Sequence, residues 1–141
     1  MSRSSVESDK PIVVAVVNTN PDLVRLLRVA LEAAGFVVLI IHIEDIKLGT
    51  ADVDMLLSQH DPRVIVYDVA PPYEQNWRFL GHLRAATDFR GRHFVLTSVN
   101  VKRLNDIVHR DESVYEVAGE PTDIAQVVRA VKEASRARAT R

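Results

Sequence analysis

The chain has 141 residues, of which 47% are hydrophobic and 26% charged, and its formal net charge at pH 7 is -1. This length suits one domain with its own core, and the composition is that of a globular protein, neither disordered nor generally basic. The absence of cysteine excludes disulfides, thiolate catalysis and cysteine-ligated zinc. No signal-peptide pattern or membrane-length apolar run occurs, so we expect a cytoplasmic protein without an anchor.

The N-terminal part of the chain begins with a polar stretch and then turns into a strand and a helix. Residues 1–10 are rich in serine and charge, so we expect a flexible leader there. Residues 12–17 form a β-branched apolar run that predicts a strand buried on both faces. Either Thr19 or Asn20 can cap the helix that follows, which has Pro21 at its first position and ends near residue 35.

The same alternation of strand and helix continues to the end of the chain. We expect strands at residues 36–43, 64–68, 93–97 and 114–118. We expect helices at residues 51–59, 76–87, 102–109 and 122–137, the last capped by Thr122, and a connection without regular structure at 44–49. Five strands alternating with helices predict an α/β fold, a doubly wound five-stranded parallel sheet with helices on both faces. We expect one domain over residues 11–137 and a basic tail over 138–141.

Polar residues follow most of the predicted strands at the point where each strand ends. In a parallel sheet these ends share one edge, which is where ligands and catalytic groups gather. Asp68 is the central acid of this set, because it closes the apolar run 64–67. The other polar residues at this edge are Asn18, Thr19, Asn20, Thr97, Ser98 and Glu120.

The order and spacing of these residues resemble the receiver domain of two-component response regulators over residues 11–136. Asp68 stands where that family carries its phosphoacceptor, and Pro72 matches the proline of the following loop. Thr97 with the small Ser98 matches the hydroxyl residue and its neighbour after the fourth strand. The resemblance implies a flavodoxin-like three-layer sandwich and a role in signal transduction.

Several positions differ from the family's pattern. Asn18 and Thr19 replace the adjacent acids that hold magnesium in receivers, so we expect no cofactor, or at most weak Mg²⁺ binding by Asn18 and Asp68. Glu120 replaces the family's lysine, and two like charges at about 4 Å repel by roughly 4 kcal/mol at an effective dielectric of 20. Val117 replaces an aromatic residue, and Asn76 stands where a glycine is usual, at a place suited to left-handed backbone.

These differences indicate a pseudo-receiver: a stand-alone, non-enzymatic protein-interaction module that works without phosphorylation. The resemblance implies that its partners are a histidine kinase, a downstream effector or a second copy of the chain, with neither nucleic acid nor membrane involved. It also implies a partner surface on the fourth helix, fifth strand and last helix, which would include Lys102, Arg103, Val117, Ile124 and Val128.

Other interpretations of the same residues stay open. Asp68 can be a true phosphoacceptor with weak Mg²⁺, or part of a small-molecule or cation site in which Glu120 shares a cation with it. Asp68 and Thr97 can also be structural residues at strand ends. Trp77 and Phe79 can anchor a partner or pack beneath their own loop.

Overall fold

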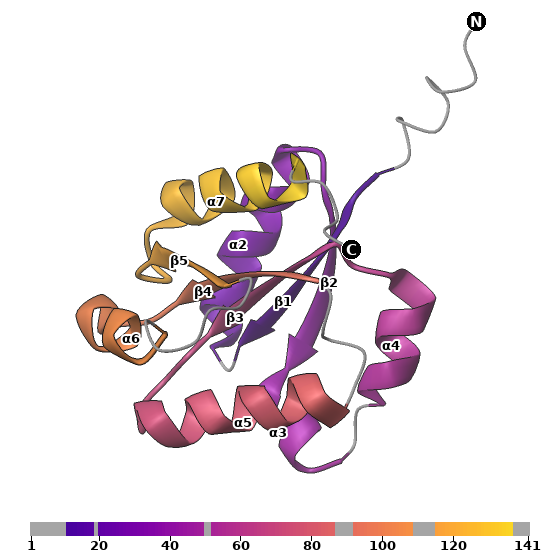
Figure 1. Ribbon diagram of the computed structural model, residues 1–141. Helices are drawn as coiled ribbons and strands as arrows, with labels where there is room; N and C mark the ends of the chain where they lie inside the picture. The colour runs from indigo at the N-terminus through magenta and orange to yellow at the C-terminus, as the bar shows by residue number, and fades with distance from the viewer. Residues whose placement is uncertain (1–10, 19, 50–51, 87–91, 109–114, 137–141) are drawn as a thin grey trace, which may run out of the picture.

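The structure of the chain is a computed structural model (Figure 1). It describes residues 11–18, 20–49, 52–86, 92–108 and 115–136. The predicted leader, the predicted basic tail and Thr19 lie outside these residues.

A five-stranded sheet forms the centre of the molecule, with the strand order β2-β1-β3-β4-β5 and parallel pairing throughout. This order is that of flavodoxin-like doubly wound sheets, so the predicted fold class is confirmed. The strands are β1 (Val13–Asn18), β2 (Val37–His42), β3 (Val64–Asp68), β4 (His93–Thr97) and β5 (Tyr115–Gly119). The bounds of β3 and β4 match the prediction.

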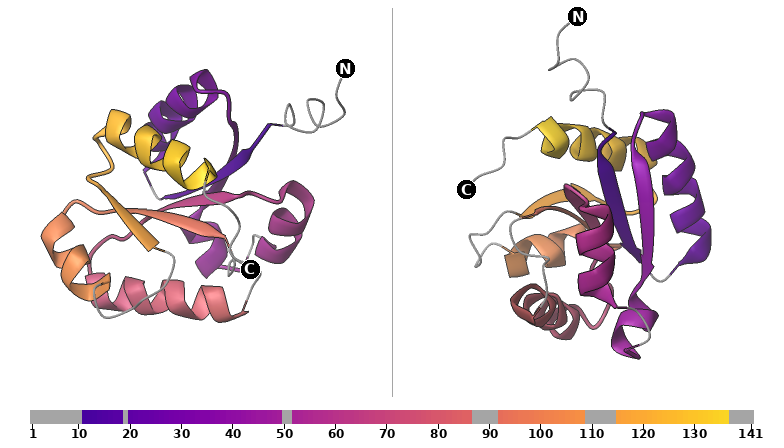
Figure 2. Two further views of the ribbon diagram at one scale, coloured as in Figure 1. Left: turned by 45° about the horizontal axis from the view of Figure 1, so that its top comes forward. Right: turned by 90° about the vertical axis from the view of Figure 1, so that its right-hand side faces the viewer.

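Helices cover both faces of the sheet (Figures 1 and 2). The first face carries α2 (Pro21–Ala33) and α7 (Ile124–Arg136), which pack against each other. The second face carries α3 (Ile43–Lys47), α4 (Val53–His60), α5 (Tyr73–Ala86) and α6 (Val101–Val108). The chain therefore has the three layers that the resemblance implied.

The core consists of two apolar clusters, one on each face of the sheet. Successive residues of each strand point to opposite faces, so Val14 and Val16 pack with α2 and α7 while Ala15 and Val17 pack with α4, α5 and α6. All four of these strand residues are fully buried. Burial on both faces explains why the strands are continuously apolar instead of alternating.

Three local predictions were wrong. Residues 44–49 do not form an irregular connection, because Ile43–Lys47 is a short helix that places Ile43 and Ile46 against the core. Helix α5 begins at Tyr73, directly after Pro72, and not at residue 76. Thr122 does not cap α7, because that helix begins at Ile124 and the Asp123 carboxylate accepts from its first turn, from the Gln126 N–H at 3.3 Å.

The prediction that Asn20 caps the first helix is confirmed. Its side-chain oxygen accepts from the backbone N–H of Asp22 at 3.0 Å and of Leu23 at 3.3 Å. These two amides would otherwise have no partner within the helix. Pro21 occupies the first helical position, where its missing N–H costs nothing.

Candidate functional site at the carboxyl ends of the strands

Three polar residues lie in a row across β1, β3 and β4, where these strands end. Asp68 pairs in register with Thr97 on β4. Asn18 follows Val17, whose register partner is Tyr67, so Asn18 lies on the other side of Asp68. The row Asn18, Asp68 and Thr97 therefore contains one carboxylate, flanked by an amide and a hydroxyl.

Asp68 is partly buried and is bound by its neighbour on β4. The Thr97 hydroxyl donates to Asp68 Oδ1 at 2.7 Å, and Thr97 itself is only 1% exposed. Burial raises the pKa of the Asp68 carboxyl above its ordinary value, and the Thr97 hydrogen bond opposes part of that rise. The acid is thus held in a site that disfavours its charge.

Backbone hydrogen bonds tie the ends of β3, β4 and β5 together. The N–H of Val69, just after Asp68, donates to the Thr97 carbonyl at 2.9 Å. The N–H of the fully buried Ser98 donates to the Gly119 carbonyl at 3.1 Å. The Ser98 hydroxyl accepts from the N–H of Asn100 at 3.2 Å. These bonds connect Thr97 and Ser98 to the neighbouring strand ends and to the turn that follows β4.

The amides of Asn18 and Asn20 have local hydrogen-bond partners. Asn18 is 4% exposed, and its Oδ1 accepts from the N–H of Asn20 at 2.9 Å. The Asn20 side-chain oxygen caps α2, as described above. Of the pocket residues predicted on this loop, Asn18 therefore lies beside Asp68, whereas Asn20 serves the helix.

Glu120 lies in the connection between β5 and α7, and it is exposed. Its backbone carbonyl accepts from the N–H of Asp123 at 3.0 Å, which closes the turn into α7. The pKa of Asp68 is raised by burial, and the Thr97 hydrogen bond opposes part of that rise. A cation shared by Asp68 and Glu120 stays a prediction.

The residues at this edge do not fit a tight magnesium site. Magnesium prefers an octahedral set of oxygen ligands that includes carboxylates. Asp68 and Asn18 offer one carboxylate and one amide, and one side-chain oxygen of each already accepts a hydrogen bond. Within the described ranges, no group of three or more His, Asp or Glu side chains is arranged to hold a metal ion. Weak Mg²⁺ binding stays a prediction.

A second polar contact orders the loop after Asp68, and sequence reasoning missed it. Asn76 Nδ2 donates to the carbonyl of Ala70 at 2.7 Å, and Lys47 Nζ donates to Asn76 Oδ1 at 3.4 Å. Lys47 also lies 5.2 Å from the centre of the Phe79 ring. Asn76 is helical, so the prediction of left-handed backbone there was wrong. Lys47 was overlooked because residues 44–49 were expected to lack regular structure.

Trp77 and Phe79 do not form a free aromatic anchor. Both are half-buried and pack against the core cluster on the second face. Their packing agrees with the alternative that such residues lie beneath their own loop.

The residues predicted for the partner surface lie around β5, at one edge of the sheet. Lys102 and Arg103 are exposed on α6, and Arg103 pairs with Glu74 at 3.3 Å. Val117 is half-buried against the second face, while Ile124 and Val128 are half-buried against the first. The five residues therefore flank one sheet edge from both faces.

Comparison with solved structures identifies the fold of the chain. Neither a comparison with protein-family models nor one with curated proteins finds a match. Among solved structures, the E. coli RcsC C-terminus, which contains a linker region and a phosphoreceiver domain, aligns with a TM-score of 0.66 and 15% identity. That alignment covers 89% of this chain and 46% of the RcsC structure, so the chain spans less than half of it.

Two further structures are covered almost completely. A response regulator protein from Burkholderia multivorans aligns with a TM-score of 0.57 and 14% identity, over 92% of this chain and 99% of its own. The N-terminal domain of a response regulator receiver protein from Methanoculleus marisnigri JR1 aligns with a TM-score of 0.53 and 15% identity, over 89% of this chain and 98% of its own. No helix in the described part of the chain is long and apolar enough to cross a membrane. The chain thus has the fold of response regulator receiver domains.

Proposed function

We propose that this protein is a receiver-like signalling module that docks other proteins and does not depend on phosphorylation of Asp68. The fold supports the signalling part, because the solved structures it matches are receiver domains. The composition of the edge where the strands end supports the second part.

The observation that carries the proposal is the environment of Asp68. Burial already disfavours its negative charge, and within the described ranges no lysine or arginine forms an ion pair with it. Transfer of a phosphoryl group would add up to about two negative charges at this position. Phosphoryl transfer in proteins relies on fixed positive charge to stabilise that build-up. A partly buried acid without such a partner is a poor phosphoacceptor.

The residues on either side of Asp68 also disfavour its phosphorylation. Asn18 is neutral where a second carboxylate would attract a cation, and its oxygen accepts from Asn20. Thr97 donates to Asp68 in the unmodified protein, so one oxygen of the Asp68 carboxylate has a hydrogen-bond partner without a ligand. Little interaction energy is left with which phosphorylation could shift the protein between two states.

The docking surface in this proposal is the edge of the sheet at β5. Strand β5 pairs with β4 on one side only among the described residues. The exposed cations Lys102 and Arg103 lie on α6 beside it. A signalling partner with acidic side chains, such as a histidine kinase or an effector, or a second copy of this chain, would dock there.

Incubation with acetyl phosphate and Mg²⁺, followed by intact-mass measurement, tests independence from phosphorylation. We expect no adduct in the wild-type protein or in Asp68→Asn, while a phosphoaccepting response regulator treated in parallel gains the mass of one phosphoryl group. A stable adduct on the wild-type protein that is absent from Asp68→Asn would establish Asp68 as a phosphoacceptor and reject the proposal.

Sedimentation velocity tests the homodimer separately. If copies associate through the β5 edge, the double variant Lys102→Glu and Arg103→Glu is expected to contain more monomer than the wild-type protein at the same concentration. The control variant Arg78→Glu, which changes an exposed cation on α5, is expected to leave the association unchanged. A dimer insensitive to the double variant would place the contact elsewhere.

A further inference from the structure

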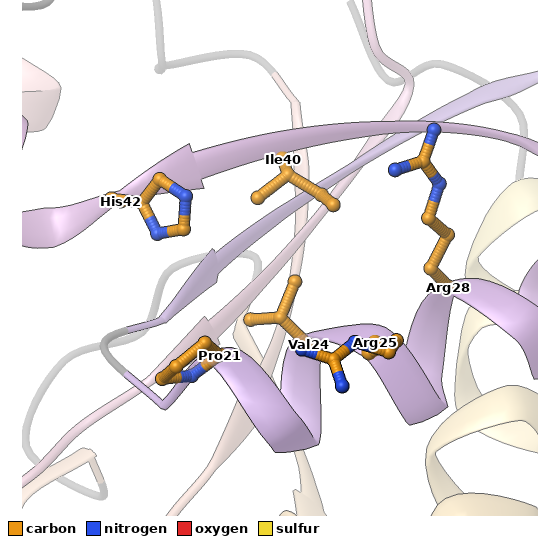
Figure 3. Close-up of a pocket in the computed structure, with 6 residues that line it drawn as sticks. All are labelled: Pro21, Val24, Arg25, Arg28, Ile40 and His42. Carbon is orange, nitrogen blue, oxygen red and sulfur yellow. The ribbon is translucent and has the colours of Figure 1, made fainter.

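A shallow hollow lies between α2 and β2, at the opposite edge of the sheet from β5 (Figure 3). Its volume is about 160 Å³. Val24 from α2 and Ile40 from β2 line it with apolar side chains (Figure 3). The other residues that line it are Pro21, Arg25, Arg28 and His42.

The hollow is bordered by positive charge. Arg25 and Arg28 line it from α2, and no carboxylate is among its lining residues. Each arginine pairs along the helix, Arg25 with Asp22 at 3.7 Å and Arg28 with Glu32 at 3.2 Å. All four of these side chains are at least half exposed. Exposed pairs of this kind contribute only about 0 to 1 kcal/mol, so an incoming acid can exchange with them.

Strand β2 also offers backbone hydrogen-bonding groups beside the hollow. Among the described residues it pairs only with β1. The N–H of Val37 points toward β1, because it donates to the Ile12 carbonyl at 3.0 Å. Successive residues of a parallel strand direct these groups to alternate sides. The N–H and carbonyl groups of Val38 and Ile40 therefore point away from β1, in the plane of the sheet, where they can pair with an added strand.

The volume of the hollow, its two arginines and the edge of β2, unpaired among the described residues, together indicate what kind of ligand binds here. Pockets that enclose drug-sized ligands have volumes of about 300 to 1,000 Å³, so a hollow of about 160 Å³ suits a single side chain. The arginines select acidic groups, and the open strand selects an extended backbone. We propose that β2 binds an extended acidic segment of a partner protein, which adds as a strand and places an apolar side chain in the hollow. This surface is separate from Asp68 and from the β5 edge.

A labelled peptide tests the proposal by fluorescence polarisation. The probe is a short fluorescein-labelled peptide in which glutamate and valine alternate, compared with a peptide in which lysine replaces every glutamate. We expect the acidic peptide alone to bind, and its binding to weaken as salt is added, because salt screens exposed charges. Equal binding of both peptides would overturn the proposal.

Charge variants locate the contact. Arg25→Glu combined with Arg28→Glu is expected to weaken binding of the acidic peptide by about tenfold or more. The milder pair Arg25→Gln and Arg28→Gln tests the same contact without adding negative charge. Arg78→Glu combined with Lys132→Glu is the matched control, since both residues are exposed on other helices. Circular dichroism checks that each variant is folded, and unchanged affinity in both arginine pairs would reject the site.

Hydrogen exchange measured by NMR tests strand addition itself. With the acidic peptide bound, we expect the amides of Val38 and Ile40 to exchange more slowly, while those of Leu39 and Ile41 change little because they already face β1. Arginine-dependent binding without this protection would overturn strand addition. Displacement of the peptide by an oligonucleotide or by phosphatidylserine vesicles, with the same arginine dependence, would identify a general anion site and reject a protein partner.

Discussion

Thr97 and Asp68 are register partners on adjacent strands, and the Thr97 hydroxyl donates to Asp68 Oδ1 at 2.7 Å. The bond joins the fourth strand to the only acid in the row across β1, β3 and β4. The bond lowers the pKa of Asp68 and so opposes part of the rise that burial causes. The stability of the sheet edge and the charge of the acid therefore depend on each other.

Replacing Thr97 with valine keeps the volume of the side chain and removes its donor. We expect Thr97→Val to lower the free energy of unfolding at neutral pH by about 1 to 2 kcal/mol, because it leaves a partly buried carboxylate without a partner. Urea unfolding measures the change. Thr122→Val, at an exposed position, is the control and is expected to have little effect. Equal stability of Thr97→Val and the wild type would show that the bond contributes nothing net.

The pH dependence of stability should reveal the raised pKa of Asp68. Between pH 3.8 and that raised pKa the folded chain binds more protons than the unfolded chain, so this residue makes stability fall as pH rises through that window. Asp68→Asn removes the titration. We expect it to be more stable than the wild type at neutral pH, with the difference shrinking as the pH falls from the raised pKa to 3.8 and staying constant below that.

Urea midpoints at a series of pH values measure this difference between Asp68→Asn and the wild type. Asp106→Asn, an exposed acid on α6, serves as the control. A difference that grows on acidification would contradict a raised pKa for Asp68 in the folded protein.

Restoring a carboxylate beside Asp68 should create a magnesium site. We expect Asn18→Asp to increase Mg²⁺ affinity by about tenfold or more, because the charge of the ligands sets the affinity of oxygen sites. Calorimetric titration measures the affinity, and Asn105→Asp on α6 controls for net charge. If Asn18→Asp binds Mg²⁺ no better than the wild type, charge is not what limits this site.

Arg92 joins the start of β4 to the connection before β3. Its side chain is 12% exposed and donates to Asp61 Oδ1 at 2.8 Å and to the Pro62 carbonyl at 2.7 Å. We expect Arg92→Ala to destabilise the protein by about 2 kcal/mol, the range for hydrogen bonds with a charged partner. Thermal unfolding compares it with the exposed control Arg78→Ala. Matching transition temperatures in the two variants would refute this role.

Capping by Asn20 gives a prediction for helix α2. We expect Asn20→Ala to lower stability by about 1 kcal/mol, because two amides of the first turn lose their acceptor. Asn105→Ala, within α6, is expected to be neutral or slightly stabilising, since alanine is the better helix former. The pair is compared by urea unfolding, and a larger loss in Asn105→Ala would contradict the assignment.

The sequence alone determined the architecture and the order of the polar strand ends. Apolar β-branched runs predict buried parallel strands, so Val64–Asp68 and His93–Thr97 were located to the residue. Asn20 was one of two candidate caps, with Thr19, and such candidates can be found in the sequence because the bonds a cap makes span two or three residues. Such features depend on near neighbours in the chain, and local sequence records them.

Only the tertiary structure decided the contacts between distant segments. Lys47 and Asn76 are 29 residues apart, as are Thr97 and Asp68. The helix at Ile43–Lys47 is stabilised because Ile43 and Ile46 pack against the core. Local helix propensity does not indicate this packing. The pKa of Asp68 and the basic hollow beside β2 depend on how strands and helices meet in space. Burial and charge proximity arise from packing, so no pattern along the chain specifies them.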